Sequence, residues 1–217
     1  ARTRKSYIGC DYWPVDLDNA IEVWPQPPEG GVCMIPTEDP WVFRNDLSIC
    51  TNGNRHNGLC DFGQTCPDGF RCELAPACVL DAQNSDFAIV VSNPSNRTVA
   101  TVTLIDAAGT ELQQEVAPGE LAKLYPYRSG LSDLSIDGTG RGSAFRLTST
   151  IPIVAYQFNP LDNVGVFSND GSLLLPSHAL GSEYFALTLP TLDRRPVAHA
   201  YTGYITIVAT AANPTNI

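Results

Sequence analysis

Residues 141–190 read RGSAFRLTSTIPIVAYQFNPLDNVGVFSNDGSLLLPSHALGSEYFALTLP, and this stretch decides the fold. Three runs within it have the β-branched and aromatic composition of strands: Ala144–Ser149, Ile153–Phe158 and Tyr184–Leu189. Ile151-Pro152 is expected to break the chain between the first two runs, because proline cannot donate to a strand ladder. The insert Asn159–Leu175 is rich in Asn, Asp, Gly and Ser and leads into the apolar run Leu173–Pro176. We predict a long polar loop that this run anchors back onto a sheet.

The chain upstream continues the same pattern of short strands and turns. Four further strands are predicted, at Phe87–Ser92, Val99–Asp106, Glu111–Val116 and Leu121–Tyr125. Turns rich in Asn, Pro and Gly separate them, and this spacing is typical of antiparallel sandwiches. The sequence therefore predicts an all-β fold, with an antiparallel β-sandwich over residues 83–180.

A sequence echo suggests a second, related sandwich. FAIVVSNPSNRTV at Phe87–Val99 and ITIVATAANPTNI at Ile205–Ile217 both place an apolar strand before Asn-Pro-Ser/Thr-Asn. On this interpretation residues 181–217 open a second sandwich that is incomplete. An uncovered apolar face is unstable in water, so we expect a longer chain, a cleaved fragment or a neighbouring subunit to supply the missing strands.

All the cysteines lie in the N-terminal part of the chain. The seven are Cys10, Cys33, Cys50, Cys60, Cys66, Cys72 and Cys78. The last four recur every six residues, which differs from the CxxC pairs of zinc ribbons and favours disulfides over a metal. We therefore predict a disulfide-rich module at 25–82, after an N-terminal segment at 1–24. An odd number leaves one cysteine unpaired or bonded to another chain, and the spacing does not choose the pairing.

The charge and the cysteines limit the compartment and the partners. The net charge of −10 and the pI near 4.6 argue against nucleic acid as a partner, because nucleic-acid binding needs a basic face. No run approaches the length of a membrane span. Disulfides form outside the reducing cytosol, so we expect a mature, secreted or cell-surface protein that starts after a cleaved signal peptide.

The sequence contains no recognisable catalytic motif. HExxH, GxSxG and the P-loop are all absent, which favours a protein that is not an enzyme and has no organic cofactor. The polar loop nevertheless carries Asn159, Asp162, Asn163 and Asp170, with Asn169 beside them, and such oxygens suit calcium. Two alternatives stay open for the loop: Asx turns that bond their own backbone, and a hydrolase that uses the Asp162/Asp170 carboxylates.

Aromatic side chains are the other candidate binding residues. Five of them could form a carbohydrate platform or could be core and sheet-edge residues instead: Tyr12, Trp13, Trp24, Trp41 and Tyr125.

Several of these segments also resemble a known family. GCDYWPVDLDNA, DFAIVVSNPSN, FRLTSTIPIVAYQFNPLDN, SNDGSLLLPSHALGSEYF and GYITIVAT look like the IgGFc-binding-protein N-terminal domain family, in its secreted bacterial, myxobacteria-like variants. The resemblance covers most of residues 9–24 and 81–217, so 25–80 looks like an insertion. It implies an extracellular β-sandwich with a binding or matrix role, but no Fc-contact motif maps onto this chain.

The function expected from these observations is adhesion through an extracellular protein or glycan ligand. The first alternative is a subunit of an extracellular filament or surface assembly that is completed by strand sharing. The Asp-rich loop hydrolase is the second alternative.

Overall fold

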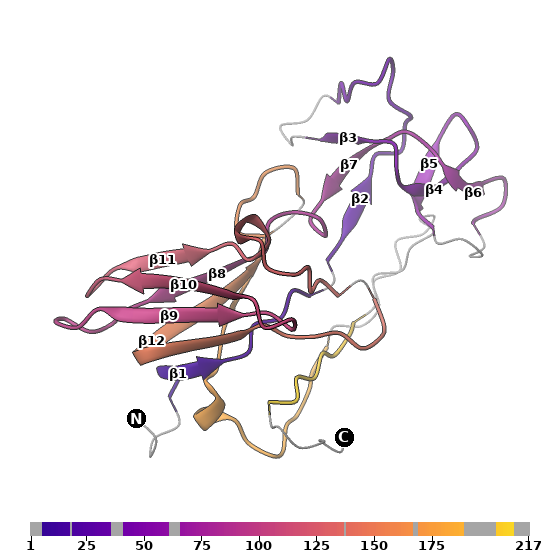
Figure 1. The fold of residues 1–217 in the computed structure, drawn as a ribbon. Coiled ribbons are helices and arrows are strands. Elements are labelled where there is room, and N and C mark those ends of the chain that lie inside the picture. Colours follow the sequence, from indigo (N-terminus) through magenta and orange to yellow (C-terminus); the bar gives the residue numbers. More distant parts are fainter. Residues whose placement is uncertain are drawn as a thin grey trace.

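The computed structural model describes residues 6–17, 19–35, 41–60, 66–136, 138–166, 169–188 and 203–210. Within these ranges the chain is built from antiparallel strands, with two single 3₁₀ turns, η1 (Tyr127–Ser129) and η2 (Ser177–Ala179), and no α-helix. The prediction of an all-β fold with a disulfide-rich region is confirmed (Figure 1). None of the described residues belongs to a helix that could cross a membrane.

Two four-stranded layers form the sandwich, and they share one long strand, β12 (Arg146–Asn159). The first layer has the order β10 (Glu111–Val116), β9 (Ala100–Ile105), β12 and β1 (Gly9–Tyr12). The second has the order β11 (Leu121–Leu124), β8 (Ala88–Ser92), β12 and β13 (Asp170–Leu173). The four strands predicted between residues 87 and 125 are confirmed to within one residue at each end.

The expected break at Ile151-Pro152 is wrong, because β12 runs through it without interruption. The first part of β12, residues 146–149, pairs with β9, and the last part, residues 154–158, pairs with β8. Pro152 lies at the crossing between the two layers, opposite an irregularity in the register of β1. Its missing N–H therefore interrupts no regular ladder, which is where a sheet tolerates proline.

Alternating side chains fill the space between the two layers. On β9, Ala100, Val102 and Leu104 are fully buried, whereas the residues between them are only partly buried. The rings of Phe87 and Phe145 stack with their centroids 6.1 Å apart in this core. β9 thus buries one of its two faces in the core between the layers.

The loop predicted at Asn159–Leu175 contains strand β13, which pairs with β12. The anchoring predicted for the apolar run is confirmed: the Leu174 N–H donates to the Ala155 carbonyl at 2.9 Å, and the Leu174 side chain packs on the core. Just beyond it, Ser177 Oγ donates to Asp11 Oδ2 at 2.6 Å. The chain is thus held against β1 before it reaches Gly181.

The disulfide-rich module has two small sheets and its own core. One sheet has the order β2 (Ile21–Val23), β7 (Ala77–Asp81), β3 (Val42–Arg44), and the other β5 (His56–Leu59), β4 (Ser48–Thr51), β6 (Arg71–Leu74). Between the sheets lie Ile49, Ala75, Ala77 and Val79. The chain leaves the sandwich after β1 and returns at β8, so the module is an insertion into the sandwich and lies at one end of it (Figure 1).

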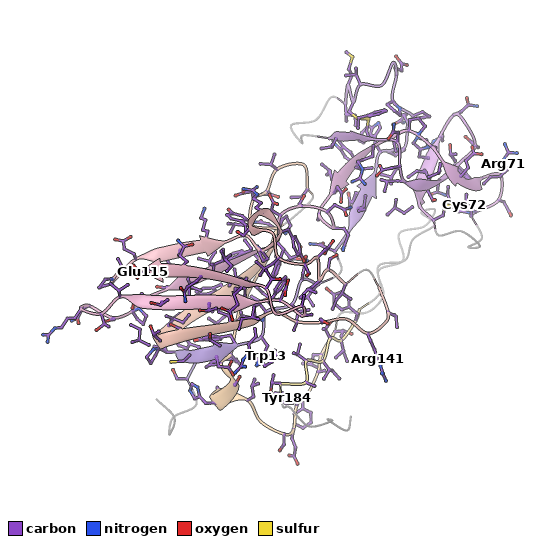
Figure 2. All side chains as sticks on the ribbon, in the orientation of Figure 1. Trp13, Arg71, Cys72, Glu115, Arg141 and Tyr184 are labelled. Atoms are coloured by element: carbon purple, nitrogen blue, oxygen red, sulfur yellow. A yellow bond between two sulfur atoms is a disulfide. The ribbon has the colours of Figure 1, made fainter. Side chains whose placement is uncertain are left out.

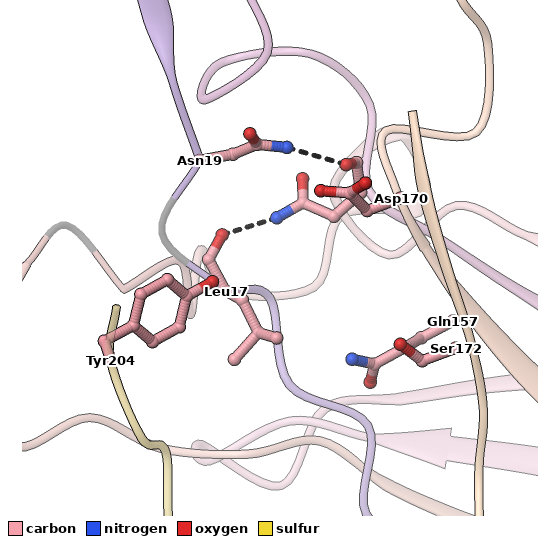
Figure 3. A pocket seen from close by; sticks show the side chains of 7 residues that line it. Leu17, Asn19, Gln157, Asp170, Ser172 and Tyr204 are labelled. Atoms are coloured by element: carbon pink, nitrogen blue, oxygen red, sulfur yellow. Dashed lines mark hydrogen bonds between the residues drawn. The ribbon is translucent and has the colours of Figure 1, made fainter. Parts of the chain in front are cut away.

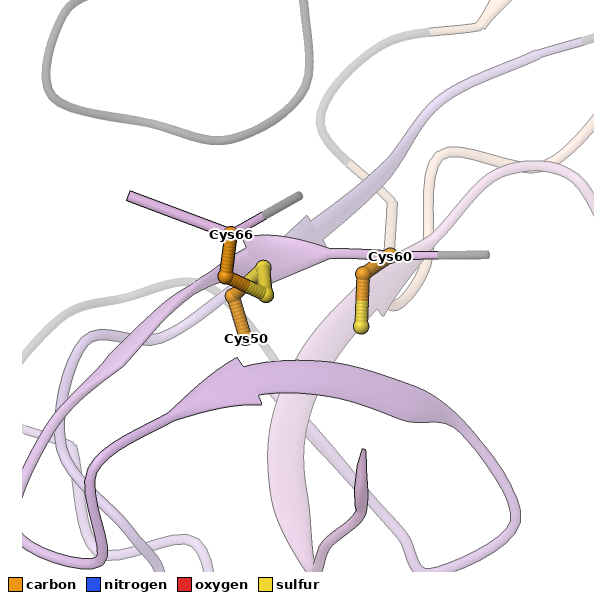
Figure 4. Close-up of side chains that lie close together, drawn as sticks. All are labelled: Cys50, Cys60 and Cys66. Carbon is orange, nitrogen blue, oxygen red and sulfur yellow. A yellow bond between two sulfur atoms is a disulfide. The ribbon is translucent and has the colours of Figure 1, made fainter. Parts of the chain in front are cut away.

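Three disulfides staple the module: Cys33–Cys78, Cys50–Cys66 and Cys60–Cys72. Cys10, on β1, is the cysteine outside these three bonds, as the odd number predicted. The sulfurs of Cys50, Cys60 and Cys66 lie within 4.8 Å of one another (Figure 4). They belong to two neighbouring disulfides and therefore lack the thiolates that zinc binds.

The strand predicted at Tyr184–Leu189 is wrong for its described part, since residues 184–188 form no strand. The same holds for residues 205–210 of the predicted second sandwich, and residues 189 and 211–217 lie outside the described ranges. Both segments have the apolar composition of strands. A strand needs a hydrogen-bonded neighbour, and neither segment has one in the part of the chain that the structure describes.

Candidate binding surface

The outer face of the β2-β7-β3 sheet gathers aromatic side chains. Val23 pairs with Val79, whose side chain points into the module core. Neighbouring residues of a strand point to opposite faces, so Cys78 and its partner Phe43 point outward. Trp24 lies opposite Cys78 and on the same face, because the backbone N–H of Trp24 donates to the Cys78 carbonyl at 2.8 Å.

Trp41 lies two residues before Phe43 and so shares its face. The rings of Trp24 and Trp41 pack edge to face, with centroids 5.2 Å apart and planes at 68°. The Cys33–Cys78 disulfide reaches this face through Cys78. We call Trp24, Trp41 and Phe43 the aromatic face.

The aromatic face is suited to binding rather than to catalysis. Half-buried indole rings are already ordered, so a ligand that stacks on them loses little further side-chain entropy. Aromatic rings are among the side chains enriched at the centres of protein interfaces. Either the apolar faces of sugar rings or apolar protein side chains can cover such a surface.

The five aromatic residues proposed as a platform do not lie together. Tyr12 is buried in the sandwich core. Trp13 lies under the Arg146 guanidinium, 5.5 Å from it, and Tyr125 lies under that of Arg128 at 4.5 Å. Trp24 and Trp41 are thus the pair that the fold brings together. Phe43 was not predicted from the sequence, although the alternation in Trp41-Val42-Phe43 is a signal for it.

Two of the four predicted calcium ligands meet at a small pocket of about 40 Å³ (Figure 3). Asn159 and Asp170 face each other in the β12–β13 register and both line this pocket. Asn159 Oδ1 is buried without a hydrogen-bond partner in the described part of the chain, and the Asn159 amide group donates to the Leu17 carbonyl.

Asp162 and Asn163 are exposed and are not among the residues that line this pocket. Of the four predicted ligands, the pocket therefore brings together one carboxylate and one free amide oxygen, whereas calcium takes six to eight oxygens. Calcium at these four residues stays a prediction. Nor does the pocket bring the Asp162 and Asp170 carboxylates together for hydrolysis, and Asn169 Nδ2 donates to the Leu161 carbonyl at 3.2 Å.

His56 lies buried inside the module, where its ring makes one hydrogen bond to the backbone. It is buried, and its Nε2 lies 3.0 Å from the Pro76 carbonyl, to which it donates. Its Nδ1 is buried and finds no partner among the described residues. Burial lowers the pKa of His56, so the ring is held neutral.

Comparison with family models, curated proteins and solved structures finds no match to this chain. Its function is therefore inferred from its own geometry.

Proposed function

We propose that this chain is a secreted or cell-surface binding protein, without catalytic activity, whose aromatic face holds an extracellular protein or glycan. The observation that carries the proposal is the packed Trp24–Trp41 pair beside Phe43 on the outer side of a disulfide-stapled sheet. Apolar side chains grouped on an outer face in this way mark interaction sites. The three disulfides support an oxidising compartment, and the resemblance to the IgGFc-binding-protein N-terminal family points to the same role.

The charge of the chain narrows the ligand class. With a net charge of −10, the protein repels polyanions at low ionic strength. We therefore expect neutral or basic ligands, such as neutral glycans or basic segments of extracellular proteins. Sulfated polysaccharides should bind weakly.

Arrays of neutral glycans and of extracellular matrix proteins test this proposal. The wild-type chain should bind at least one ligand, and Trp24→Ala combined with Phe43→Ala should weaken that binding at least tenfold. Leu121→Ala is the matched control, because Leu121 is a large apolar residue that is 65% exposed on β11 of the sandwich. A wild type without signal above background, or equal binding by the double variant, would overturn the proposal.

A further inference from the structure

Four of the cysteines form one cluster in the disulfide-rich module. Cys50 lies on β4 and Cys72 on β6, and Cys60 directly follows β5. The sulfurs of Cys50, Cys60 and Cys66 lie within 4.8 Å of one another, and the bond to Cys60 places the sulfur of Cys72 beside them (Figure 4 shows the first three). The disulfides Cys50–Cys66 and Cys60–Cys72 are therefore neighbours, and we call the four residues the cystine cluster.

The same four positions suit a second pairing. Cys50 and Cys72 face each other in the register of β4 and β6. Residues opposite each other on antiparallel strands have Cα atoms about 4.5–5.5 Å apart and side chains on the same face. A disulfide joins Cα atoms about 4.4–6.8 Å apart, so a Cys50–Cys72 bond fits this sheet. The remaining two cysteines, Cys60 and Cys66, already have their sulfurs within 4.8 Å of each other.

Burial decides which sulfurs a dissolved thiol can reach. Cys50 is 0% exposed and Cys60 is 7% exposed, whereas Cys66 and Cys72 are half-buried. Cys72 lies on β6, an edge strand of its sheet whose other residues are all exposed. Figure 2 shows Cys72 at the outer end of the module, away from the sandwich. A small thiol therefore reaches Cys72 or Cys66, and in either case it displaces a buried sulfur of the cluster.

We propose that the cystine cluster is a reaction site for small monothiols, which exchange its two disulfides for a second pair. The thiolate attacks Cys72 Sγ, forms a mixed disulfide there and expels Cys60 as a thiolate. Cys60 Sγ attacks Cys66 Sγ, forms a bond to it and expels Cys50 as a thiolate. Cys50 Sγ then attacks Cys72 Sγ across the β4–β6 pair, and the small thiol leaves as a thiolate.

The exchange consumes no oxidant and no reductant. Two disulfides break, two others form, Cys50–Cys72 and Cys60–Cys66, and the small thiolate is released again. Attack at Cys66 gives the same product, because it expels Cys50 first and Cys60 second. The third disulfide takes no part, since its Cys78 lies on β7 in the other sheet. The aromatic face also lies on that other sheet, so either proposal can fail without the other.

Disulfide mapping of the full chain tests this proposal. A Cys10→Ser chain keeps the six bonded cysteines, and reduced glutathione at substoichiometric concentration serves as the monothiol. After an acid quench and alkylation, peptic peptides are analysed by mass spectrometry without reduction. We expect Cys50–Cys72 and Cys60–Cys66 to appear while Cys33–Cys78 persists.

Three results of this mapping would overturn the proposal. The first is that the native pairs alone are found, and the second is that they are reduced without formation of the new pairs. The third is that Cys33 or Cys78 also changes its partner, because the exchange would then reflect unfolding of the module and not the cystine cluster.

Single substitutions in the Cys10→Ser chain place one thiol inside or outside the cluster. Cys72→Ser leaves the Cys60 thiol beside the Cys50–Cys66 bond, so exchange should start without glutathione and transfer part of the thiol to Cys50. Cys33→Ser is the matched control, because it leaves a thiol on Cys78, outside the cluster. We expect exchange to be roughly tenfold faster, or more, in the first variant than in the control. A thiol that stays on Cys60, or equal rates in the two variants, would contradict the proposal.

Discussion

At the scale of the residue, one hydroxyl group joins the first strand of the sandwich to its central strand. The Tyr12 hydroxyl accepts from Gly9 and donates to Ile153, and burial raises its pKa, so it stays protonated. We predict that Tyr12→Phe lowers the free energy of unfolding by about 1–3 kcal/mol, because two buried backbone groups lose their partner. Urea unfolding followed by circular dichroism measures this loss.

Tyr184→Phe is the matched control for that substitution. The Tyr184 hydroxyl accepts the same kind of hydrogen bond from Gly181. The Tyr184 side chain is mostly exposed, however, so water can replace the lost partner. We expect a change within about 0.5 kcal/mol. Equal losses in the two variants would contradict the role given to burial at Tyr12.

His56 makes the stability of the module depend on pH. Its pKa is lowered in the folded chain, so the unfolded chain binds the proton more readily below a pH of about 6.5. The contribution of the neutral ring is complete above that pH and is lost progressively as the pH falls below it. The melting temperature of the module should fall from pH 7.5 to pH 5. His56→Gln keeps a donor for Pro76 and should reduce this fall, and an unchanged pH dependence would exclude His56 as its cause.

At the scale of the element, β12 shows what a local pattern can and cannot predict. The composition predicts both apolar runs, but it also predicts a break at the proline between them, where β12 is continuous. A proline ends a strand only where the residue at its position would have to donate an N–H to a neighbouring strand. Here the strand passes from one layer to the other at that point, and the strands on either side are known only from the fold. The strand β13 was not predicted, since all its residues are exposed and a polar run rich in Asn and Asp leads into it.

The contact between β1 and Pro176, at the end of the apolar run Leu173–Pro176, requires a glycine at position 9. A Cβ atom on Gly9 would lie 2.4 Å from Cβ of Pro176, which is far inside van der Waals contact. We predict that Gly9→Ala destabilises the sandwich by about 1–3 kcal/mol, the usual cost of overpacking. Thermal unfolding measures it.

The matched control is Gly181→Ala, where the nearest atom is 3.9 Å from the added Cβ. It should be neutral or slightly stabilising, because alanine restricts the unfolded chain. A loss at Gly181 as large as at Gly9 would show that backbone entropy, and not the Pro176 contact, decides the effect.

At the scale of the whole molecule, the sandwich and the stapled module could be predicted from the sequence, and the aromatic face could not. Strand spacing and clustered cysteines are properties of short stretches. The meeting of Trp24 with Trp41 depends on the β2-β7-β3 register and on which cysteine bonds Cys78. Neither is encoded by spacing. The kind of hydrogen bond that Tyr12 and Tyr184 share could not be predicted either, because it depends on the local backbone conformation at Gly9 and Gly181.

The last prediction concerns how the module and the sandwich unfold. Each has its own core, and the Cys33–Cys78 disulfide spans 45 residues, against 12 for Cys60–Cys72. Loop-closure entropy then gives the first bond a contribution of about 4 kcal/mol and the second about 3 kcal/mol. Cys33→Ser with Cys78→Ser should therefore speed hydrogen exchange at the amides of β7 and abolish ligand binding by the aromatic face.

The same double variant should leave the amides of β9 protected, because β9 packs only in the sandwich core. Cys60→Ser with Cys72→Ser is the matched control and should loosen β6 while it spares the Trp24–Trp41 pair. Mass spectrometry of exchanged peptides resolves these strands. If protection of β9 fell together with that of β7, the two cores would unfold as one unit, and the module could not be treated as an independent insertion into the sandwich.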